Sequence, residues 1–457
     1  MKKVFSIGFW MLFATCLTAQ QNDSITIRKI YSEVLTNGKC YQTLDYLCNK
    51  IGQRLSASNN AAKAVSYTAQ QMYNFGFDTV YLQPIVVPHW IRGEKEIGNI
   101  VKGKNEIKVH VCALGNSVGT RLEGVQAPVI EVQNFKQLAE LGTEKIKGKI
   151  VFFNRPMDPT YISTGRAYGE AGNQRGRGPL EAAKYGAVGV VVRSLTLALD
   201  TNPHTGYTHY VDTIPWIPGC AISTVDANLL SDMLKEDTSG SVEFYFRQTC
   251  ERLMDDLSYN VIGELRGSEK KEEVLVVGGH LDSWDLGTGA HDDGAGVTQS
   301  MEAVRAMKAL KLKPKRTIRC VLFMNEENGV KGGNAFAKEV KTKNEKVLVA
   351  IESDGGGFTP RGFNVDDPNA SIKFQKWIPL LKPYGIETIK EGHSGTDIEP
   401  LKENGTITIG YVVDSQRYFD YHHTAIDTFD KVNKRELELG AASMASLLWL
   451  ISEYGIK

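Results

Sequence analysis

The chain has 457 residues, and its hydrophobic fraction of 42% supplies enough apolar surface for a large buried core. Lysine plus arginine and aspartate plus glutamate both number 53, so the formal net charge is zero. This balance argues against a nucleic-acid-binding protein, which would carry a basic excess, and against an acidic solvating tail. The length predicts either two or three domains or one large α/β enzyme that carries an insertion.

The N-terminus has the pattern of an export signal. Two lysines precede an apolar stretch, residues 4–17, and small or polar residues follow it. We predict a signal peptide over residues 1–19, cleaved after Ala19, and a secreted or periplasmic protein. The apolar stretch is too short to cross a bilayer comfortably, and no other stretch is long enough, so we expect no transmembrane segment. A lipoprotein attached through Cys16 is less favoured, because Thr15 is a poor match for the small residue required there.

Six cysteines follow this leader: Cys40, Cys48, Cys112, Cys220, Cys250 and Cys320. Their even number is compatible with disulfides in an exported protein, but their wide spacing indicates neither particular pairs nor a zinc knuckle. Cys320 lies inside an apolar run, so we expect a buried thiol there.

Helical periodicity dominates the first part of the mature chain. Residues 25–77 have a helical pattern that breaks at Gly52–Ser58. Apolar residues at helical spacing predict a helix over Ala61–Tyr73, with Gly76 suited to its C-terminal cap. A strand is predicted next, over Val80–Val87.

A middle region, residues 108–248, has a different character. Its chain order is a strand at Ile150–Phe153, a Gly-rich polar stretch at Gly165–Gly178, a short helix at Leu180–Tyr185 and a strand at Val188–Val192. This strand-helix-strand text resembles the protease-associated domain, a module inserted into several secreted peptidases. The resemblance implies an insertion over 108–248 within a catalytic domain made of residues 20–107 and 249–457.

The C-terminal half alternates strands and helices, which predicts an α/β fold with a doubly wound, mostly parallel sheet. The expected strands are Val274–Val277, Ile318–Met324, Val347–Ile351 and Ile407–Val413. The expected helices are Val297–Leu310, Ala335–Val340 and Arg435–Tyr454.

Potential metal ligands follow these strands repeatedly. In open α/β sheets, ligands collect at the carboxyl ends of the strands. Here the four strands are followed, in chain order, by His280 and Asp282, by Glu326 and Glu327, by Asp354, and by His422 and His423, while Asp292 lies in a Gly-rich loop before a helix. Histidine and carboxylates gathered at one rim suit zinc, so the pattern predicts a zinc site.

Longer motifs make a family resemblance specific. They are Gly279–Asp285, Gly289–Gly296, Asn325–Glu327, Glu352–Asp354 and His422–Thr428, with Ile51–Ser56 and Pro88–Glu94 outside the site. The text resembles the zinc aminopeptidase and glutamate carboxypeptidase family, and most closely its plasma glutamate carboxypeptidase branch, over nearly the whole mature chain.

The resemblance implies two zinc ions and a role for each ligand. His280 and Asp354 would bind the first ion, Glu327 and His423 the second, and Asp292 would bridge them. Ions bridged by one carboxylate lie ~3.5–4 Å apart, acidify the attacking water and polarise the scissile carbonyl.

Two acidic residues would support this chemistry without binding metal. Glu326 would be the general base. Asp282, two residues after His280, would hydrogen bond to that imidazole and orient it.

Some assignments have competitors nearby. His422 competes with His423, but only a frame starting at His423 matches the family pattern of His, Ser or Thr, two variable residues, Asp or Glu, and Thr. Asp293 competes with Asp292, the first Asp of the pair, which bridges in the family. His291 is expected on the substrate side or at the surface. Ser394 either contacts a peptide terminus or belongs to an ordinary turn.

The predicted function is therefore a secreted zinc exopeptidase that acts on short peptides by metal-activated water. Which peptide terminus it recognises stays open, since the family holds both aminopeptidases and carboxypeptidases. A receptor-like binding protein and a glutaminyl cyclase are the alternatives on related folds; the cyclase would need only one zinc. The resemblance also makes a homodimer possible.

Overall fold

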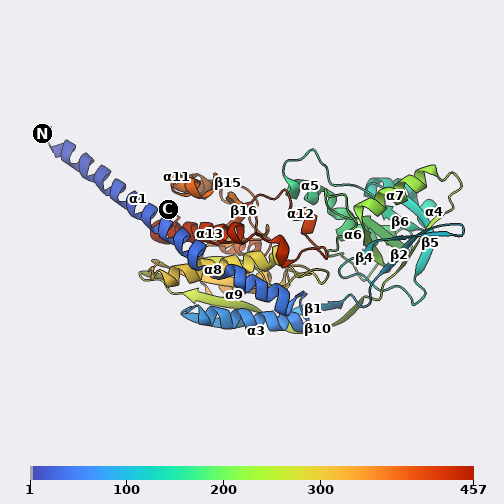
Figure 1. Ribbon diagram of the computed structural model, residues 1–457, viewed down its shortest axis with the longest axis horizontal. Coiled ribbons are helices and arrows are strands. Elements are labelled where there is room, and N and C mark those ends of the chain that lie inside the picture. The colour runs from blue at the N-terminus through green and yellow to red at the C-terminus, as the bar shows by residue number, and fades with distance from the viewer. Residues whose placement is uncertain (1–3, 457) are drawn as a thin grey trace.

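The computed structural model describes residues 4–456 of the chain. The predicted signal peptide begins outside this range, and the side chains of residues 1–20 lie outside the description as well. Helix α1 (Val4–Asn37) contains the rest of that segment, and its first turns project away from the body of the molecule (Figure 1). Within the described part of the chain, no helix combines the length and apolar character that a membrane span needs.

Two eight-stranded sheets lie at opposite ends of the molecule (Figure 1). Residues 97–247 carry the second sheet and enter the chain between β1 and β10, so we call them the inserted body. The remaining described residues form the main body. The second sheet begins at β2, ahead of residue 108, because β2 and β3 form a hairpin that pairs with β9.

The main-body sheet is mixed, with a parallel centre. Strands β12, β11, β13 and β16 run parallel, while β1, β10 and β14 add antiparallel pairings on either side. In spatial order its strands are β1 (Thr79–Ile91), β10 (Glu251–Leu265), β12 (Arg316–Phe323), β11 (Lys270–His280), β13 (Lys346–Glu352), β16 (Ile407–Val413), β14 (Pro360–Val365) and β15 (Thr388–Glu391). The α/β class and the parallel central strands are thus confirmed.

Helices cover both faces of this sheet, which explains why apolar residues follow one another in its central strands, as at residues 274–277 of β11. On β11, Leu275 and Val277 face the cluster shared with α1, α3 (Asn59–Asn74), α8 (Ala295–Ala309) and α13 (Lys434–Tyr454). The alternate residues Val274 and Val276 face α9 (Lys331–Lys343) and the short helix η5 (Glu399–Asn404).

Shorter elements complete the main body. They are α2 (Cys40–Tyr46), η1 (Leu47–Ile51), η2 (Ala290–Gly294), α10 (Pro368–Phe374), η3 (Gln375–Trp377), α11 (Ile378–Leu381), η4 (Lys382–Tyr384), α12 (Tyr418–Tyr421) and η6 (Phe429–Lys431). The predicted helix at residues 61–73 is α3, which ends at Asn74, and Gly76 follows it with a φ of 77°. The break predicted at residues 52–58 separates η1 from α3.

The inserted body has its own two-sided core. Its strands, in spatial order, are β3 (Asn105–Val109), β2 (Ile97–Lys102), β9 (Val242–Arg247), β5 (Val125–Val132), β6 (Ile150–Phe153), β7 (Gly189–Arg193), β8 (Gly219–Ile222) and β4 (Val111–Ala113). Its helices are α4 (Phe135–Ile146), α5 (Thr164–Ala171), α6 (Asn173–Ala183) and α7 (Thr224–Glu236). Within β6, Val151 and Phe153 pack on one face and Ile150 and Phe152 on the other.

The Gly-rich stretch Gly165–Gly178 is helical, although its composition is typical of a loop. The Ser163 side chain accepts a hydrogen bond from the Arg166 backbone and caps α5. Buried residues such as Ala167 and Gln174 then pack this segment, and tertiary contacts override the low helix propensity of glycine.

All six described cysteines are buried and unbridged. The buried thiol predicted at Cys320 is confirmed, whereas none of the disulfides allowed by the even count is present among them.

Candidate metal centre

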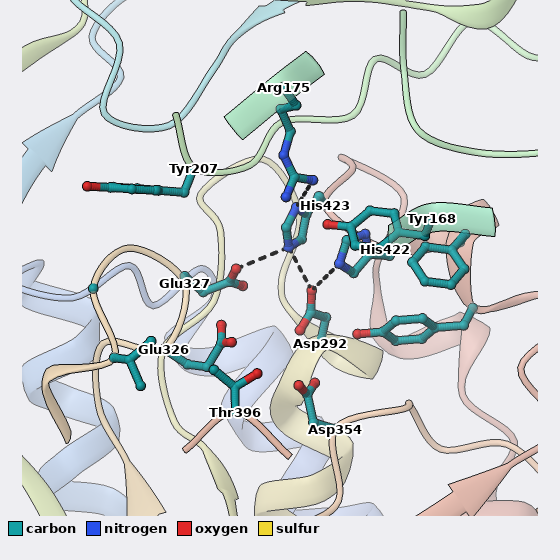
Figure 2. A pocket seen from close by; sticks show the side chains of 14 residues that line it. Tyr168, Arg175, Tyr207, Asp292, Glu326, Glu327, Asp354, Thr396, His422 and His423 are labelled. Carbon is teal, nitrogen blue, oxygen red and sulfur yellow. Dashed lines mark hydrogen bonds and ion pairs between the residues drawn. The ribbon is translucent and has the colours of Figure 1, made fainter. Parts of the chain in front are cut away.

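The predicted ligands converge at the carboxyl ends of the central strands. His280 is the last residue of β11, Glu326 and Glu327 follow β12, and Asp354 follows β13. Asp292 lies in η2, just ahead of α8, and its side chain lies between His423 and Asp354 in Figure 2. Because parallel strands end on the same edge of a sheet, side chains from distant segments meet there.

One group of ligand atoms surrounds the His280 ring. Its Nε2 lies 3.1 Å from Asp292 Oδ1 and 3.5 Å from Asp354 Oδ1. The three ligand atoms of this group lie within 4.8 Å of one another, a span that can hold one metal ion.

A second group surrounds His423 (Figure 2). Its Nε2 lies 3.3 Å from Asp292 Oδ2 and 3.1 Å from Glu327 Oε2. Asp292 therefore turns one carboxylate oxygen to each group, which is the arrangement of a ligand that bridges two ions.

His422 lies beside His423 and shares part of this environment. The two rings stack with centroids 3.5 Å apart, and His422 Nε2 lies 3.6 Å from Asp292 Oδ2. Three aromatic side chains, Tyr168, Tyr418 and Phe419, surround the His422 ring. The geometry brings both histidines to Asp292, and the contact with Glu327 belongs to His423.

The donor set fits a cation. Asp292 Oδ2 and Asp354 Oδ1 are buried and have no hydrogen-bond partner among the described residues, although a buried polar atom normally has one. Burial, together with neighbouring carboxylates such as Asp354, raises the pKa of Glu326 to about 7. Burial and Asp292 raise the pKa of Glu327 well above its ordinary value. Such a concentration of buried acids needs positive charge to stay ionised.

Asp282 has a different contact from the one predicted. The His280 Nδ1 atom lies 3.0 Å from the backbone carbonyl oxygen of Asp282, whereas the Asp282 carboxylate is 3.8 Å away. Asp282 Oδ1 instead accepts the backbone N–H groups of Asn325 (2.7 Å) and Glu326 (3.1 Å). The prediction that its carboxylate orients the imidazole was wrong, because the main chain supplies that acceptor and leaves the carboxylate to hold the loop after β12.

Two further buried carboxylates hold backbone segments of the site in the same way. Asp427 accepts the N–H groups of His291 (2.8 Å) and Asp292 (3.1 Å). Asp293 accepts those of His280 and Gly296, each at 2.9 Å. Asp293 therefore faces the β11 backbone while its neighbour Asp292 faces the ligand groups.

His291 and Ser394 are the two remaining positions that the sequence singled out. His291 is fully buried and stacks on Phe358, with centroids 4.2 Å apart, so the prediction of a substrate-side or surface residue was wrong. The Ser394 hydroxyl accepts a hydrogen bond from the Thr408 hydroxyl on β16, and Thr396 is the residue of that loop that lines the cavity (Figure 2). The aromatic neighbours of His291 and the partner strand of Ser394 were not identifiable from spacing.

The inserted body also lines the cavity, and sequence analysis missed its residues. Arg175 Nη1 lies 3.4 Å from His423 Nδ1, and the guanidinium stands over the Tyr168 ring. Its Nε atom is buried without a hydrogen-bond partner, and the arginine forms no salt bridge within the described residues. Gly206 leaves room for it, since a Cβ there would lie 2.5 Å from the guanidinium carbon. No motif marks Arg175, because only the packing of the two bodies brings it to the site.

Comparisons with known proteins agree with this arrangement. The model of peptidase family M28 matches residues 260–448. The carboxypeptidase Q of Xenopus laevis is 34% identical over 433 residues, covering 94% of this chain and 88% of the relative. A solved structure of a peptidase M28 precursor from Shewanella amazonensis has 33% identity and a TM-score of 0.90, covering 95% of this chain and 97% of the other. A zinc aminopeptidase from Bacillus subtilis shares the fold, with 18% identity, a TM-score of 0.62 and coverage of 90% and 94%.

Proposed function

Since the chain belongs to peptidase family M28 and is a metallo-exopeptidase, we propose that it hydrolyses dipeptides or short peptides with two zinc ions and Glu326 as general base. The observation that carries this proposal is the shared position of Asp292. Its two carboxylate oxygens face two separate ligand groups, and Glu326 lines the same cavity.

Zinc suits the two groups chemically. Each combines one imidazole with carboxylate oxygens, which are donors that zinc accepts, and catalytic zinc sites keep one position open. His280, Asp292 and Asp354 would hold one ion, and Asp292, Glu327 and His423 the other. The buried oxygens of Asp292 and Asp354 that have no hydrogen-bond partner support this assignment.

The ions, when bound, would acidify the attacking water and polarise the scissile carbonyl. Glu326 would take the proton from that water and deliver it to the departing amine. A pKa raised to about 7 suits a group that must both accept and release a proton. Asp282 would act as a positioning residue, because its carboxylate holds the Glu326 backbone.

The substrate end in the cavity would be a free carboxylate. Arg175 is a half-buried cation in a cavity whose acids are the proposed ligands and base, and its buried Nε atom has no hydrogen-bond partner among the described residues. Arginine matches a carboxylate with two parallel N–H groups. This favours a carboxypeptidase or dipeptidase over an aminopeptidase, as does the likeness to carboxypeptidase Q.

Dipeptides with one blocked end test this choice. We expect a C-terminal amide to be cleaved at least about 10-fold more slowly than the free acid, because a hydrogen bond to a charged group is worth ~1.5–3 kcal/mol. An acetylated amino end should have a smaller effect. Arg175→Gln should remove the preference for the free acid. Arg177→Gln is the matched control, because Arg177 is exposed and pairs with Glu181.

If acetylation abolishes cleavage and amidation does not, the enzyme is an aminopeptidase. One zinc per chain would favour glutaminyl cyclase chemistry, and no zinc with no turnover would favour a binding protein.

We further propose an exported location, from the charged and apolar N-terminal residues, and a protease-associated-like character for the inserted body. We also propose, from the family resemblance, that the protein forms a homodimer.

A further inference from the structure

His423 is attached to the inserted body by its backbone and by its ring. The Thr205 N–H donates to the His423 carbonyl oxygen (3.0 Å), and His423 Nδ1 lies 3.1 Å from the Thr205 carbonyl oxygen. Thr205 belongs to the loop between β7 and β8. His423 has a φ of 63°, a left-handed conformation that costs a non-glycine residue about 1 kcal/mol or more, so its backbone needs such support.

The hydrogen bond at Nδ1 affects Nε2, the other nitrogen of the His423 ring and the one proposed to bind metal. A histidine that binds metal through Nε2 commonly donates its Nδ1–H to a carbonyl or carboxylate, and this bond fixes both tautomer and ring orientation. His280 has the same kind of acceptor, the carbonyl of Asp282 in its own loop. For His423 the acceptor comes from the other body.

Thr205 is itself fixed through its hydroxyl. Its Oγ1 donates to the Ala113 carbonyl oxygen (2.8 Å) and accepts from Arg92 Nη2 (3.3 Å). The same Arg92 pairs with Asp285, which follows β11 in the main body, at 2.6 Å. The hydroxyl of Thr205 thus ties the His423 acceptor to a network that spans both bodies.

An apolar cluster supports this junction. Trp90 and Trp284 of the main body meet edge to face, with centroids 6.3 Å apart, and Ala113 of the inserted body packs with them. Gly115 approaches so closely that a Cβ would lie 1.7 Å from a Trp284 ring atom. The position of the Thr205 loop over His423 is therefore determined by close packing.

We infer that Thr205 is a positioning residue for His423, so that the inserted body completes one of the two metal sites. Metal affinity at the His423 site depends on how that body is seated, while the His280 site is complete within the main body. The inference rests on the proposed function, in which His423 binds the second ion.

Thr205→Val tests it, because valine keeps the shape and removes the hydroxyl. We expect roughly 5- to 10-fold weaker binding of one zinc ion, below the 10–100-fold effect of losing an outer hydrogen-bond partner outright, because the variant keeps the Thr205 carbonyl and loses only the hydroxyl that fixes it; the other ion should be unchanged. Both affinities are measured by zinc titration against a competing chelator, on full-length mature protein. Cobalt absorption spectra of the same variants should change for one of two ions only.

Thr208→Val is the matched control, since Thr208 is buried in the same loop and its hydroxyl has no hydrogen-bond partner. It should leave both affinities unchanged, and Thr205→Ser, which keeps the hydroxyl, should restore wild-type binding. If Thr205→Val does not fold, Thr205→Ala replaces it.

Three results would separate the outcomes. Two unchanged affinities in the folded Thr205 variant would overturn the inference. Equal weakening of both ions, accompanied by a lower melting temperature without metal, would overturn it too, as the residue would then be merely structural. A wild-type protein that binds a single ion would instead contradict the proposed two-zinc function.

Discussion

The His280 half and the His423 half of the centre use the same kind of contact over different distances along the chain. His280 Nδ1 meets a carbonyl two residues away, whereas His423 Nδ1 meets one 218 residues away. The His280 ring is therefore oriented as soon as its own loop forms. The His423 ring reaches its orientation only when the inserted body packs on the main body. The two halves of the proposed metal centre share Asp292, but only the His423 half depends on the packing of the inserted body.

The halves also differ in what surrounds them. His280 is fully buried in the main body, and Asp293 holds its backbone. His423 is next to Arg175 and the open cavity. The inserted body contributes Tyr168, Arg175 and Tyr207 to the wall of this cavity. In the proposed function, substrate recognition and assembly of the second site therefore share the same packing.

The largest expected effect comes from a substitution that leaves both metal sites intact. Glu326→Gln should lower kcat by about 10²–10⁴-fold, because it removes the group that accepts the proton of the attacking water. Both zinc ions should remain, since Glu326 is not a proposed ligand. Initial rates and metal analysis on the same samples check this. Glu403→Gln, at an exposed position, is the control, and a rate within a few-fold of wild type would contradict the assignment of Glu326.

The next-largest effect is the loss of one zinc ion, which distinguishes the His280 site from the His423 site directly. His423→Ala should lose one zinc ion per chain while the His280 site keeps its own, and His280→Ala should show the reverse. His422→Ala is the matched comparison and should retain two ions, because the contact with Glu327 belongs to His423. Metal analysis after gel filtration measures all three. Loss of an ion from the His422 variant, but not from the His423 variant, would reverse the ligand assignment.

The smallest expected effect is a change in zinc affinity at the His423 site alone, which tests how independent the two sites are. Asp285→Asn should weaken the pairing with Arg92, which keeps its bonds to Glu96 and Ala113. Zinc affinity at the His423 site should fall by about 0.5–1 kcal/mol, roughly 2- to 5-fold, a small coupling between neighbouring residues. The His280 site should not change. Asp255→Asn, which breaks an exposed pair with Arg252, serves as the control in the same titration. Equal changes at both sites would show that the two halves are not independent.

The ligand positions could be predicted from the sequence because a simple rule governs them. Buried strands are recognisable as apolar runs, and the polar residues that end them meet at one edge of a parallel sheet. His280, Glu327 and Asp354 follow this rule, and the structure brings them to a common site with Asp292. The division of roles between Glu326 and Glu327 stays a prediction; the contact of Glu327, and not Glu326, with His423 is compatible with it.

Other features of the site depend on the directions of side chains, which the spacing of residues along the sequence does not encode. The Asp282 carboxylate turned to the loop after β12, and His291 turned into an aromatic stack. A period of two or of 3.6 residues predicts which face a side chain occupies, but not which neighbour on that face it meets. The helical form of Gly165–Gly178 belongs here as well, because its buried partners outweigh the glycine composition.

By itself the sequence determined the α/β class, the central strands and the gathering of candidate ligands at one edge of the sheet, since these follow from local apolar patterning and from motifs within short segments. Only the tertiary structure decided that Arg175 and Thr205 belong to the site. Both are ordinary residues in their own segments, and they acquire a role because close packing around Trp284 seats the inserted body over His423.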